Sequence, residues 1–187
     1  MLAYVFWHWP QSSFERAAYE SRLIDFQTAL ERASPPGYRS ACVFRISSVP
    51  WLAAPGDAYE DWYLVDGSAA LDPLNDAAVS GLCRAPHDAA ASPAAGGTAG
   101  LYRLRAGAPV SHGGPGYWFA KPAGMSYPEL YSLLQPFTDR ANVALWGRQM
   151  TLGPAAEFCL HTKGATDLPL RLSARLVERT MVWPPDA

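Results

Sequence analysis

Tyr4-Val-Phe-Trp-His-Trp-Pro10 and Gly116-Tyr-Trp-Phe-Ala-Lys-Pro122 are two aromatic stretches, and each of them ends at a proline. Each is followed by a Ser-x-x-Glu pattern, at residues 12–15 in the first half and 126–129 in the second. This pattern is typical of a helix N-terminus, because the serine accepts a backbone N–H and the glutamate reaches back. The sequence therefore predicts the same strand-and-helix unit twice, unless the two segments are alike by coincidence.

Further strands and helices are expected in the same order after each aromatic stretch. The first half predicts strands at residues 3–9, 41–46, 60–65 and 101–105, with helices at 13–33 and 68–79. The second half predicts strands at 117–121, 143–151, 156–162 and 174–183, with a helix at 126–138. Helices are inferred from apolar residues three or four apart, and strands from aromatic and β-branched runs. The apolar stripe of the first helix is Tyr19, Leu23, Phe26, Leu30 and Ala33. Residues 83–99 are rich in Ala, Gly, Pro and Ser, which predicts a mobile loop.

The order of elements in the first half is β-α-β-β-α-β, which is that of a ferredoxin-like unit. The second half repeats this order with a poor second helix, because residues 164–173 hold only about two helical turns. We expect an α+β fold of two tandem duplicated units, whose antiparallel sheets face each other as an α/β barrel. The first unit is expected to span residues 1–105 and the second 116–187, with 106–115 as the joint.

Asp61-Trp-Tyr-Leu-Val-Asp-Gly-Ser-Ala-Ala-Leu-Asp-Pro-Leu-Asn-Asp-Ala-Ala-Val79 joins an acidic-aromatic strand to a helix. With the order of elements, this stretch resembles the dimeric α/β-barrel superfamily, in its version with two fused ferredoxin-like units. That superfamily includes antibiotic-biosynthesis monooxygenase-like proteins, stress-responsive barrel proteins and chlorite dismutase-like haem proteins. The resemblance implies facing sheets, outer helices and, in some members, a ligand cavity between the sheets. It implies no particular reaction.

Composition excludes several classes of function. Of the 187 residues, 49% are hydrophobic and 17% charged, and the net charge of −2 comes without a basic stripe for nucleic acid. Three cysteines without a Cys-x-x-Cys pair favour reduced thiols in the cytoplasm. No apolar run approaches the length of about 18 residues that a membrane helix requires. We therefore expect a cytoplasmic protein, a monomer or a homodimer, with no nucleic-acid or membrane partner.

Strand alternation assigns side chains to the two faces of each sheet. Cys42, Phe44 and Ile46 form an all-apolar set, which we assign to the face that meets the helices. The opposite face, expected to meet the other sheet, then collects many polar side chains. Either these residues form salt bridges between the sheets, or the space is hydrated and holds a ligand with a polar rim. They are Arg45, Asp61, Tyr63, Arg103, Arg105, Glu157 and His161.

The candidate catalytic residues are His8, Tyr63 and His161. The two histidines are candidates because histidine exchanges protons near neutral pH, and Tyr63 is a polar residue on the same predicted face as His161. For each of them, a purely structural role is the alternative. No His-x-His or His-x-x-x-His spacing is present, so we expect no metal site. The candidate ligand-binding residues add an aromatic wall and charged groups: they are Arg45, Tyr63, Arg103, Glu157, His161 and Trp7.

Three functions remain open. The first is a binding module, without a cofactor, for a small hydrophobic or aromatic molecule held between the two sheets. The second is a cofactor-independent monooxygenase or isomerase acting on an aromatic substrate. The third, implied by the resemblance, is a haem-binding protein of the chlorite dismutase-like kind, with His161 or His8 as the iron ligand.

Overall fold

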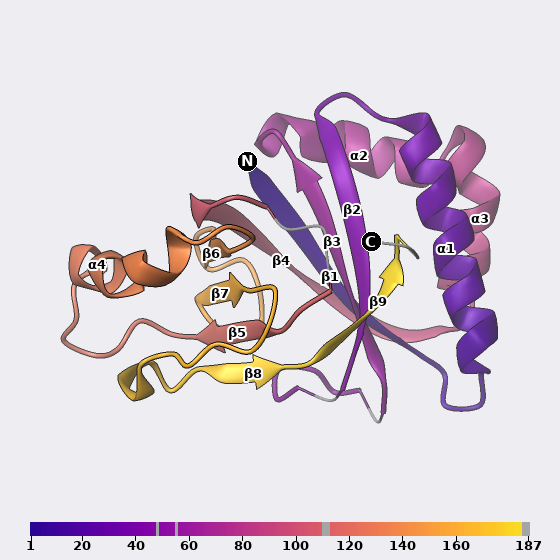
Figure 1. Cartoon of the computed structure of the whole chain (residues 1–187). Coiled ribbons are helices and arrows are strands. Elements are labelled where there is room, and N and C mark those ends of the chain that lie inside the picture. The colour runs from indigo at the N-terminus through magenta and orange to yellow at the C-terminus, as the bar shows by residue number, and fades with distance from the viewer. Residues whose placement is uncertain (48, 55, 110–112, 185–187) are drawn as a thin grey trace.

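The computed structural model describes residues 1–47, 49–54, 56–109 and 113–184. Within these residues, nine antiparallel strands form one curved sheet in the order β8-β5-β7-β6-β4-β1-β3-β2-β9 (Figure 1). The strands of the first half are β1 Leu2–Pro10, β2 Tyr38–Ile46, β3 Ala58–Val65 and β4 Ala94–Gly107. The later strands are β5 Gly116–Phe119, β6 Ala144–Arg148, β7 Phe158–His161, β8 Arg175–Val177 and β9 Arg179–Trp183. The helices are α1 Arg16–Ala33, α2 Leu71–Ala78, α3 Arg84–Ala91 and α4 Tyr127–Thr138, with single turns at Ser68–Ala70, Gly81–Cys83 and Leu170–Leu172.

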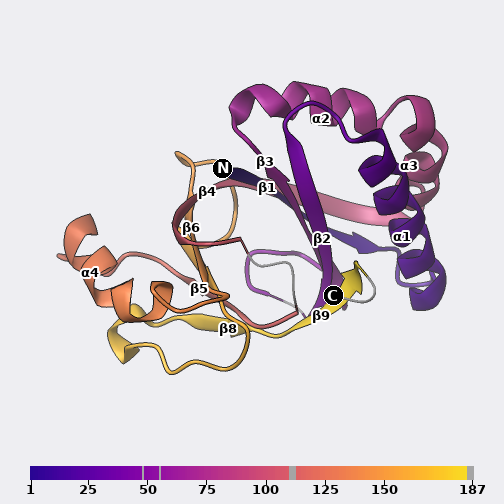
Figure 2. The same cartoon turned by 45° about the horizontal axis from the view of Figure 1, so that its top comes forward.

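The sheet is nearly closed into a barrel by the segment that contains β8 and β9. Strand β8 pairs with β5 at one end of the sheet, whereas β9 pairs with β2 at the other end. Only Glu178 separates the two strands, so the chain passes directly from one end to the other (Figures 1 and 2). This confirms an α+β fold with an antiparallel, barrel-like sheet. The expected single strand at 174–183 is corrected to two short ones.

The two halves of the sheet have the same strand order. The first half is arranged β4-β1-β3-β2 and the second β8-β5-β7-β6, which in each case is fourth, first, third, second along the chain. Pairing of β4 with β6 joins the halves. Helices α2 and α3 follow β3, whereas only the single turn Leu170–Leu172 lies between β7 and β8. The predicted boundary at 106–115 stays a prediction: β4 continues to Gly107, and residues 110–112 lie outside the described residues.

The two expected capping boxes have different outcomes. Ser126 caps α4 as expected, since its backbone N–H donates to Glu129 Oε2 (2.7 Å) and its Oγ accepts from the Glu129 N–H (3.3 Å). The first box is wrong. The Phe14 N–H donates to the Gln11 carbonyl, which makes a turn, and α1 begins only after Glu15, without a side-chain cap.

Residues 83–99 are not a loop. They contain α3 and the beginning of β4, which pairs with β1 from Trp9 to Leu2. A Cβ at Gly96 would lie 2.5 Å from the Trp9 ring, and one at Gly97 would lie 2.7 Å from the Phe6 ring. The glycines therefore allow β4 to lie against bulky aromatic side chains of its neighbour, so their abundance reflects close strand packing.

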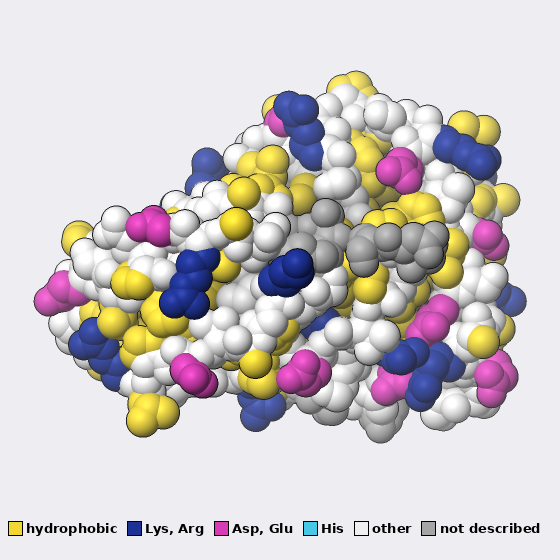
Figure 3. Space-filling model, in the orientation of Figure 1, with side chains coloured by type: hydrophobic (Ala, Val, Ile, Leu, Met, Phe, Trp, Pro, Cys, Tyr) yellow, Lys and Arg dark blue, Asp and Glu magenta, His cyan; other side chains and the backbone are white. Residues whose placement is uncertain are grey.

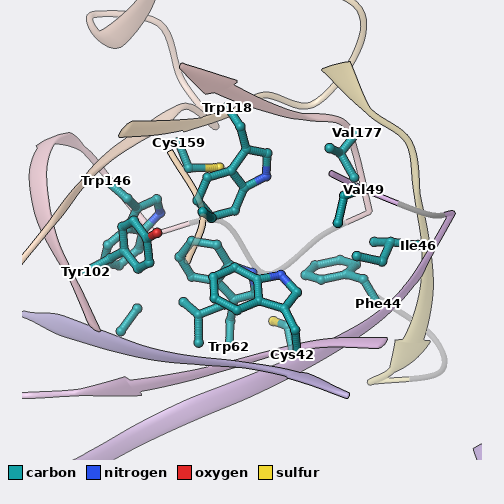
Figure 4. Close-up of a cluster of buried hydrophobic side chains, with 14 of the residues drawn as sticks. Cys42, Phe44, Ile46, Val49, Trp62, Tyr102, Trp118, Trp146, Cys159 and Val177 are labelled. Carbon is teal, nitrogen blue, oxygen red and sulfur yellow. The ribbon is translucent and has the colours of Figure 1, made fainter. Parts of the chain in front are cut away.

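The two faces of the first-half sheet are the reverse of the prediction. Cys42, Phe44 and Trp62 point into the space between the two halves, where they meet Trp118 and Cys159 (Figure 4). The opposite face packs under α1, α2 and α3, and it carries Arg45, Asp61 and Tyr63. In the second half, Phe158 and Leu160 pack with α4 and Cys159 lies on the inner side, as strand alternation predicts, but Glu157 lies on the outer side with α4, against the prediction.

The physical reason for the reversal is that both faces of this sheet are covered. Every residue of β3 is buried, so burial alone does not distinguish its two sides. The inner space is closed by strands, which favours the all-apolar set because a buried polar group needs a partner. The helix-covered face tolerates its polar side chains because they have partners: Arg45 donates to Glu20 of α1, and Tyr63 donates to Asp61.

Candidate functional site

A pocket of about 490 Å³ lies between the outer face of β1 and β3 and the three helices α1, α2 and α3. Figures 1 and 2 show these helices covering that face. Its walls are mostly apolar, because each helix turns its hydrophobic side toward the sheet. The aliphatic wall residues include Leu23 and Leu30 from α1, Leu71, Leu74 and Ala78 from α2, and Ala90 and Ala91 from α3.

One side of the pocket carries a chain of hydrogen-bonded polar residues. His8 Nε2 lies 3.1 Å from Asp61 Oδ1, and His8 Nδ1 lies 2.7 Å from the Tyr19 hydroxyl. The Tyr63 hydroxyl donates to Asp61 Oδ2 (2.9 Å), and Gln27 Nε2 donates to the Tyr63 hydroxyl (2.9 Å). All five side chains are buried, with Asp61 only 2% exposed. We call these five residues the Asp61 network.

The strand register explains how His8 meets Asp61. Tyr59 is opposite His8, and Asp61 is opposite Phe6, so His8 and Asp61 are diagonal neighbours on the same outer face. The side chain of Tyr19 approaches from the first turn of α1 that follows the β1 strand. His8 and Tyr19 come together because β1 and α1 follow each other in the chain, whereas Asp61 joins them because β3 pairs with β1.

Proton positions in the network follow from the tyrosines. Burial raises the pKa of both Tyr19 and Tyr63 well above the ordinary value, and the nearby Asp61 carboxylate is the second cause. Both hydroxyls are therefore protonated, and that of Tyr63 donates to Asp61 Oδ2. Since a carboxylate only accepts, His8 Nε2–H donates to Asp61 Oδ1, while the second ring nitrogen, Nδ1, shares a hydrogen bond with the Tyr19 hydroxyl.

Only two of the residues predicted for the site line this pocket. His8 and Tyr63 both line the pocket, and they are joined through Asp61. Arg45 lies on the same face but bonds Glu20 of α1 (2.7 Å), and it is not part of the pocket lining.

The other predicted site residues lie elsewhere. Arg103 is exposed and donates to Gln149, and Arg105 is also exposed. Glu157 accepts a hydrogen bond from the Tyr127 hydroxyl of α4 on the outside of the second half (2.6 Å). The prediction that Glu157 faces the first-half sheet is therefore wrong. Trp7 and His161 lie inside the barrel.

Trp7 and His161 belong to a second polar cluster, inside the barrel. Glu60 is fully buried and accepts from the indole N–H groups of Trp7 (2.9 Å) and Trp62 (2.7 Å). Arg179 Nη1 lies 3.6 Å from Glu60 Oε1 and 2.8 Å from His161 Nε2. Because arginine only donates, His161 Nε2 accepts this bond and is engaged. The interior ion pair therefore joins β3 of the first half to β9.

The histidines do not fit haem ligation as they stand. Both ring nitrogens of His8 have hydrogen-bond partners, and His161 Nε2 accepts from Arg179. The indole ring of Trp62 occupies space beside His161, with the two ring centroids 4.3 Å apart. Among residues 1–47, 49–54, 56–109 and 113–184, no three His, Cys, Asp or Glu side chains group as metal ligands.

The cysteines are poor nucleophiles. Cys42, Cys83 and Cys159 are buried and form no disulfide. Burial raises the pKa of Cys42 to about 11, and it raises the pKa of Cys159 well above its ordinary value. The thiols are therefore protonated at neutral pH and fill space.

Comparison with known proteins assigns no family. No protein-family model matches the chain, and no curated protein sequence matches it. In the described part of the chain, no helix combines the length and the apolar character needed to cross a bilayer. Acidic and basic side chains are dispersed over the face in Figure 3. The site must therefore be interpreted from its own chemistry.

Two residues of the Asp61 network were not anticipated. Tyr19 was expected only as part of the apolar stripe of α1, although its hydroxyl bonds His8. Gln27 stands four residues after Leu23 and is fully buried. A polar residue within the apolar stripe of a helix was the signal that could have identified it.

Proposed function

We propose that this protein binds a small, mostly apolar molecule in the pocket between β1, β3 and the three helices. The observation that carries the proposal is an apolar pocket of about 490 Å³ with one buried polar network, which is the usual character of a small-molecule site. The network would fix the orientation of a polar group on the ligand, and the aliphatic walls would supply the affinity.

The proposed site lies on the helix-covered face of β1 and β3, not in the space between the sheets where the sequence predicted it. The inner space is filled by aromatic rings: the centroid of Trp118 lies 5.7 Å from that of Trp7, 6.1 Å from Trp62 and 5.3 Å from Trp51. Figure 4 shows Trp62 of the first half and Trp118 of the second half pointing into this space. Such packing leaves the helix-covered pocket as the better supported place for a ligand.

We also infer that the chain is a tandem duplication of a ferredoxin-like unit of the dimeric α/β-barrel kind. The shared strand order of the halves supports this inference. The test is superposition of β1, β2, β3 and β4 on β5, β6, β7 and β8. Strands of the second half that fail to overlay in matching directions would contradict it.

Filling the pocket is expected to abolish binding. Ala78 lines the pocket from α2, so the Ala78→Trp side chain would occupy the ligand's space. The matched control is Ala85→Trp, on an exposed position of α3 outside the pocket. Fluorescence titration with the neutral dye N-phenylnaphthylamine should show binding to the wild type and to Ala85→Trp, and none to Ala78→Trp. Equal binding by both variants, or no binding by the wild type, would refute the proposal.

A second candidate function is proton-transfer catalysis in the same pocket. The observation that favours it is the series Tyr19–His8–Asp61, in which a carboxylate orients a histidine whose other nitrogen bonds a hydroxyl. His8 Nδ1 would take the Tyr19 proton as Tyr19 takes one from an acidic C–H of the ligand, as an isomerase requires.

The measurement for this second function is solvent deuterium incorporation into a bound ligand, followed by mass spectrometry. Wild-type protein should catalyse the exchange, whereas His8→Asn should bind the ligand and exchange it at least tenfold more slowly. Exchange at equal rates in both proteins would exclude His8 from the chemistry. Tyr19→Phe is the companion variant, since it removes the hydroxyl and keeps the ring.

A further inference from the structure

The ionisable side chains that line the pocket include two aspartates and two histidines, but no lysine or arginine. Asp61 lies on the sheet side and Asp72 lies in the first turn of α2, whereas neither lysine nor arginine is among the lining residues. His8 and His87 are the remaining ionisable nitrogen groups. The two carboxylates of the lining therefore have no lysine or arginine of the lining to balance them.

The negative charge of Asp61 acts on the surrounding rings. Burial is the largest cause that raises the pKa of Tyr4, Tyr19 and Tyr63, and the charge of Asp61 is the second cause for each of them. A charge that is 2% exposed is weakly screened by solvent, so it acts more strongly on a neighbouring group than a surface carboxylate does. The same field that disfavours a phenolate would favour a cation.

The faces of aromatic rings reinforce this preference. Tyr4, Phe6, Phe26 and Tyr63 all line the pocket, and the rings of Tyr4 and Tyr63 have centroids 6.0 Å apart. Aromatic faces attract cations through their quadrupole, most strongly where water is excluded. An ammonium group near Asp61 would therefore meet a carboxylate and aromatic rings together.

The acceptor capacity of Asp61 allows one more hydrogen bond. A carboxylate offers about four acceptor positions. His8, Tyr63 and, at 3.5 Å, Gln27 take three of them. All three are donors, so a further donor from a ligand would complete the set. A ligand carboxylate would instead be repelled by the charge.

We propose that the pocket selects an organic cation, namely a protonated amine on an aromatic or aliphatic body, with the ammonium group directed at Asp61. This inference rests on the proposed binding function and specifies its ligand class. The apolar body would lie against the aliphatic walls, and the exposed Asp72 would attract the amine toward the opening.

The test compares three ligands of nearly equal shape by calorimetric titration: phenylbutylamine, phenylbutanol and phenylbutanoate. For the wild type we expect the amine to bind at least about tenfold more tightly than the alcohol, with the carboxylate weakest. Asp61→Asn should remove the advantage of the amine while binding of the alcohol persists. Asp72→Asn, which removes an exposed charge, should reduce amine binding less than Asp61→Asn does.

The outcomes separate this inference from the proposed function. Equal binding of the three ligands, tighter binding of the carboxylate, or dye binding without amine binding would overturn the amine preference and leave the pocket proposal standing. Failure of N-phenylnaphthylamine to bind the wild type would instead refute the pocket itself. The wild-type comparison requires no variant, so it remains decisive even if Asp61→Asn does not fold.

Discussion

Arg179→Leu should lower the free energy of unfolding by about 3–5 kcal/mol, because it leaves the Glu60 carboxylate in the barrel interior without its cationic partner. Both side chains of this pair are 0% exposed. The variant also removes the donor to His161 Nε2 and the 2.6 Å bond from Arg179 Nε to the Gly114 carbonyl. Several buried acceptors would lose their donors at once, which makes this the largest single effect that we expect from a charged residue.

Urea denaturation followed by tryptophan fluorescence measures the loss. Glu60→Gln combined with Arg179→Leu should be less destabilised than Arg179→Leu alone, because the glutamine is uncharged and still accepts from an indole. The control is Arg16→Ala, which breaks the solvent-exposed pair with Asp57 and should change stability little. If Arg179→Leu were as mild as Arg16→Ala, the interior ion pair would not hold β9 to the barrel.

Trp62→Ala should cost about 3–5 kcal/mol of unfolding free energy, since it opens a large cavity at the centre of the inner cluster. The ring of Trp62 packs against the rings of four other residues, and its N–H donates to Glu60. Those residues are Tyr102, Trp118, Trp146 and His161.

Thermal and urea unfolding should rank the variants at this position. Trp62→Phe keeps much of the volume but loses the hydrogen bond, so its stability should fall between those of the wild type and Trp62→Ala. Leu170→Ala, at a position 96% exposed, should have nearly wild-type stability. A Trp62→Ala protein as stable as Leu170→Ala would contradict the assignment of Trp62 to the packed interior.

The elements of this fold could be predicted where side chains alternate or repeat along one element. The stripe of Tyr19, Leu23, Phe26, Leu30 and Ala33 identified α1; the first four are buried, whereas Ala33 at the end of the helix is exposed. The prediction failed at residues 83–99, where the small residues are required by packing against a neighbouring strand. Gly96 and Gly97 resemble loop residues in the sequence, whereas in the structure they make room for aromatic rings of β1.

The candidate site was only partly predictable, for a similar reason. His8 and Tyr63 were selected for their chemistry, and both line the pocket. Their meeting through Asp61 depends on the pairing of β1 with β3, which sequence spacing does not show. The pairing of Glu60 with Arg179 was not predicted because the two residues lie far apart along the chain, and β9 comes close to β3 only by pairing with β2.

The pairing of β2 with β9 has a consequence for biosynthesis. While the ribosome is still making the second half, the finished β2 presents bare backbone N–H and C=O groups along its outer side. An unpaired edge of this kind can recruit a strand from another nascent chain. Translation speed through residues 47–178 therefore sets how long each new molecule is exposed to misassembly before its own β9 arrives.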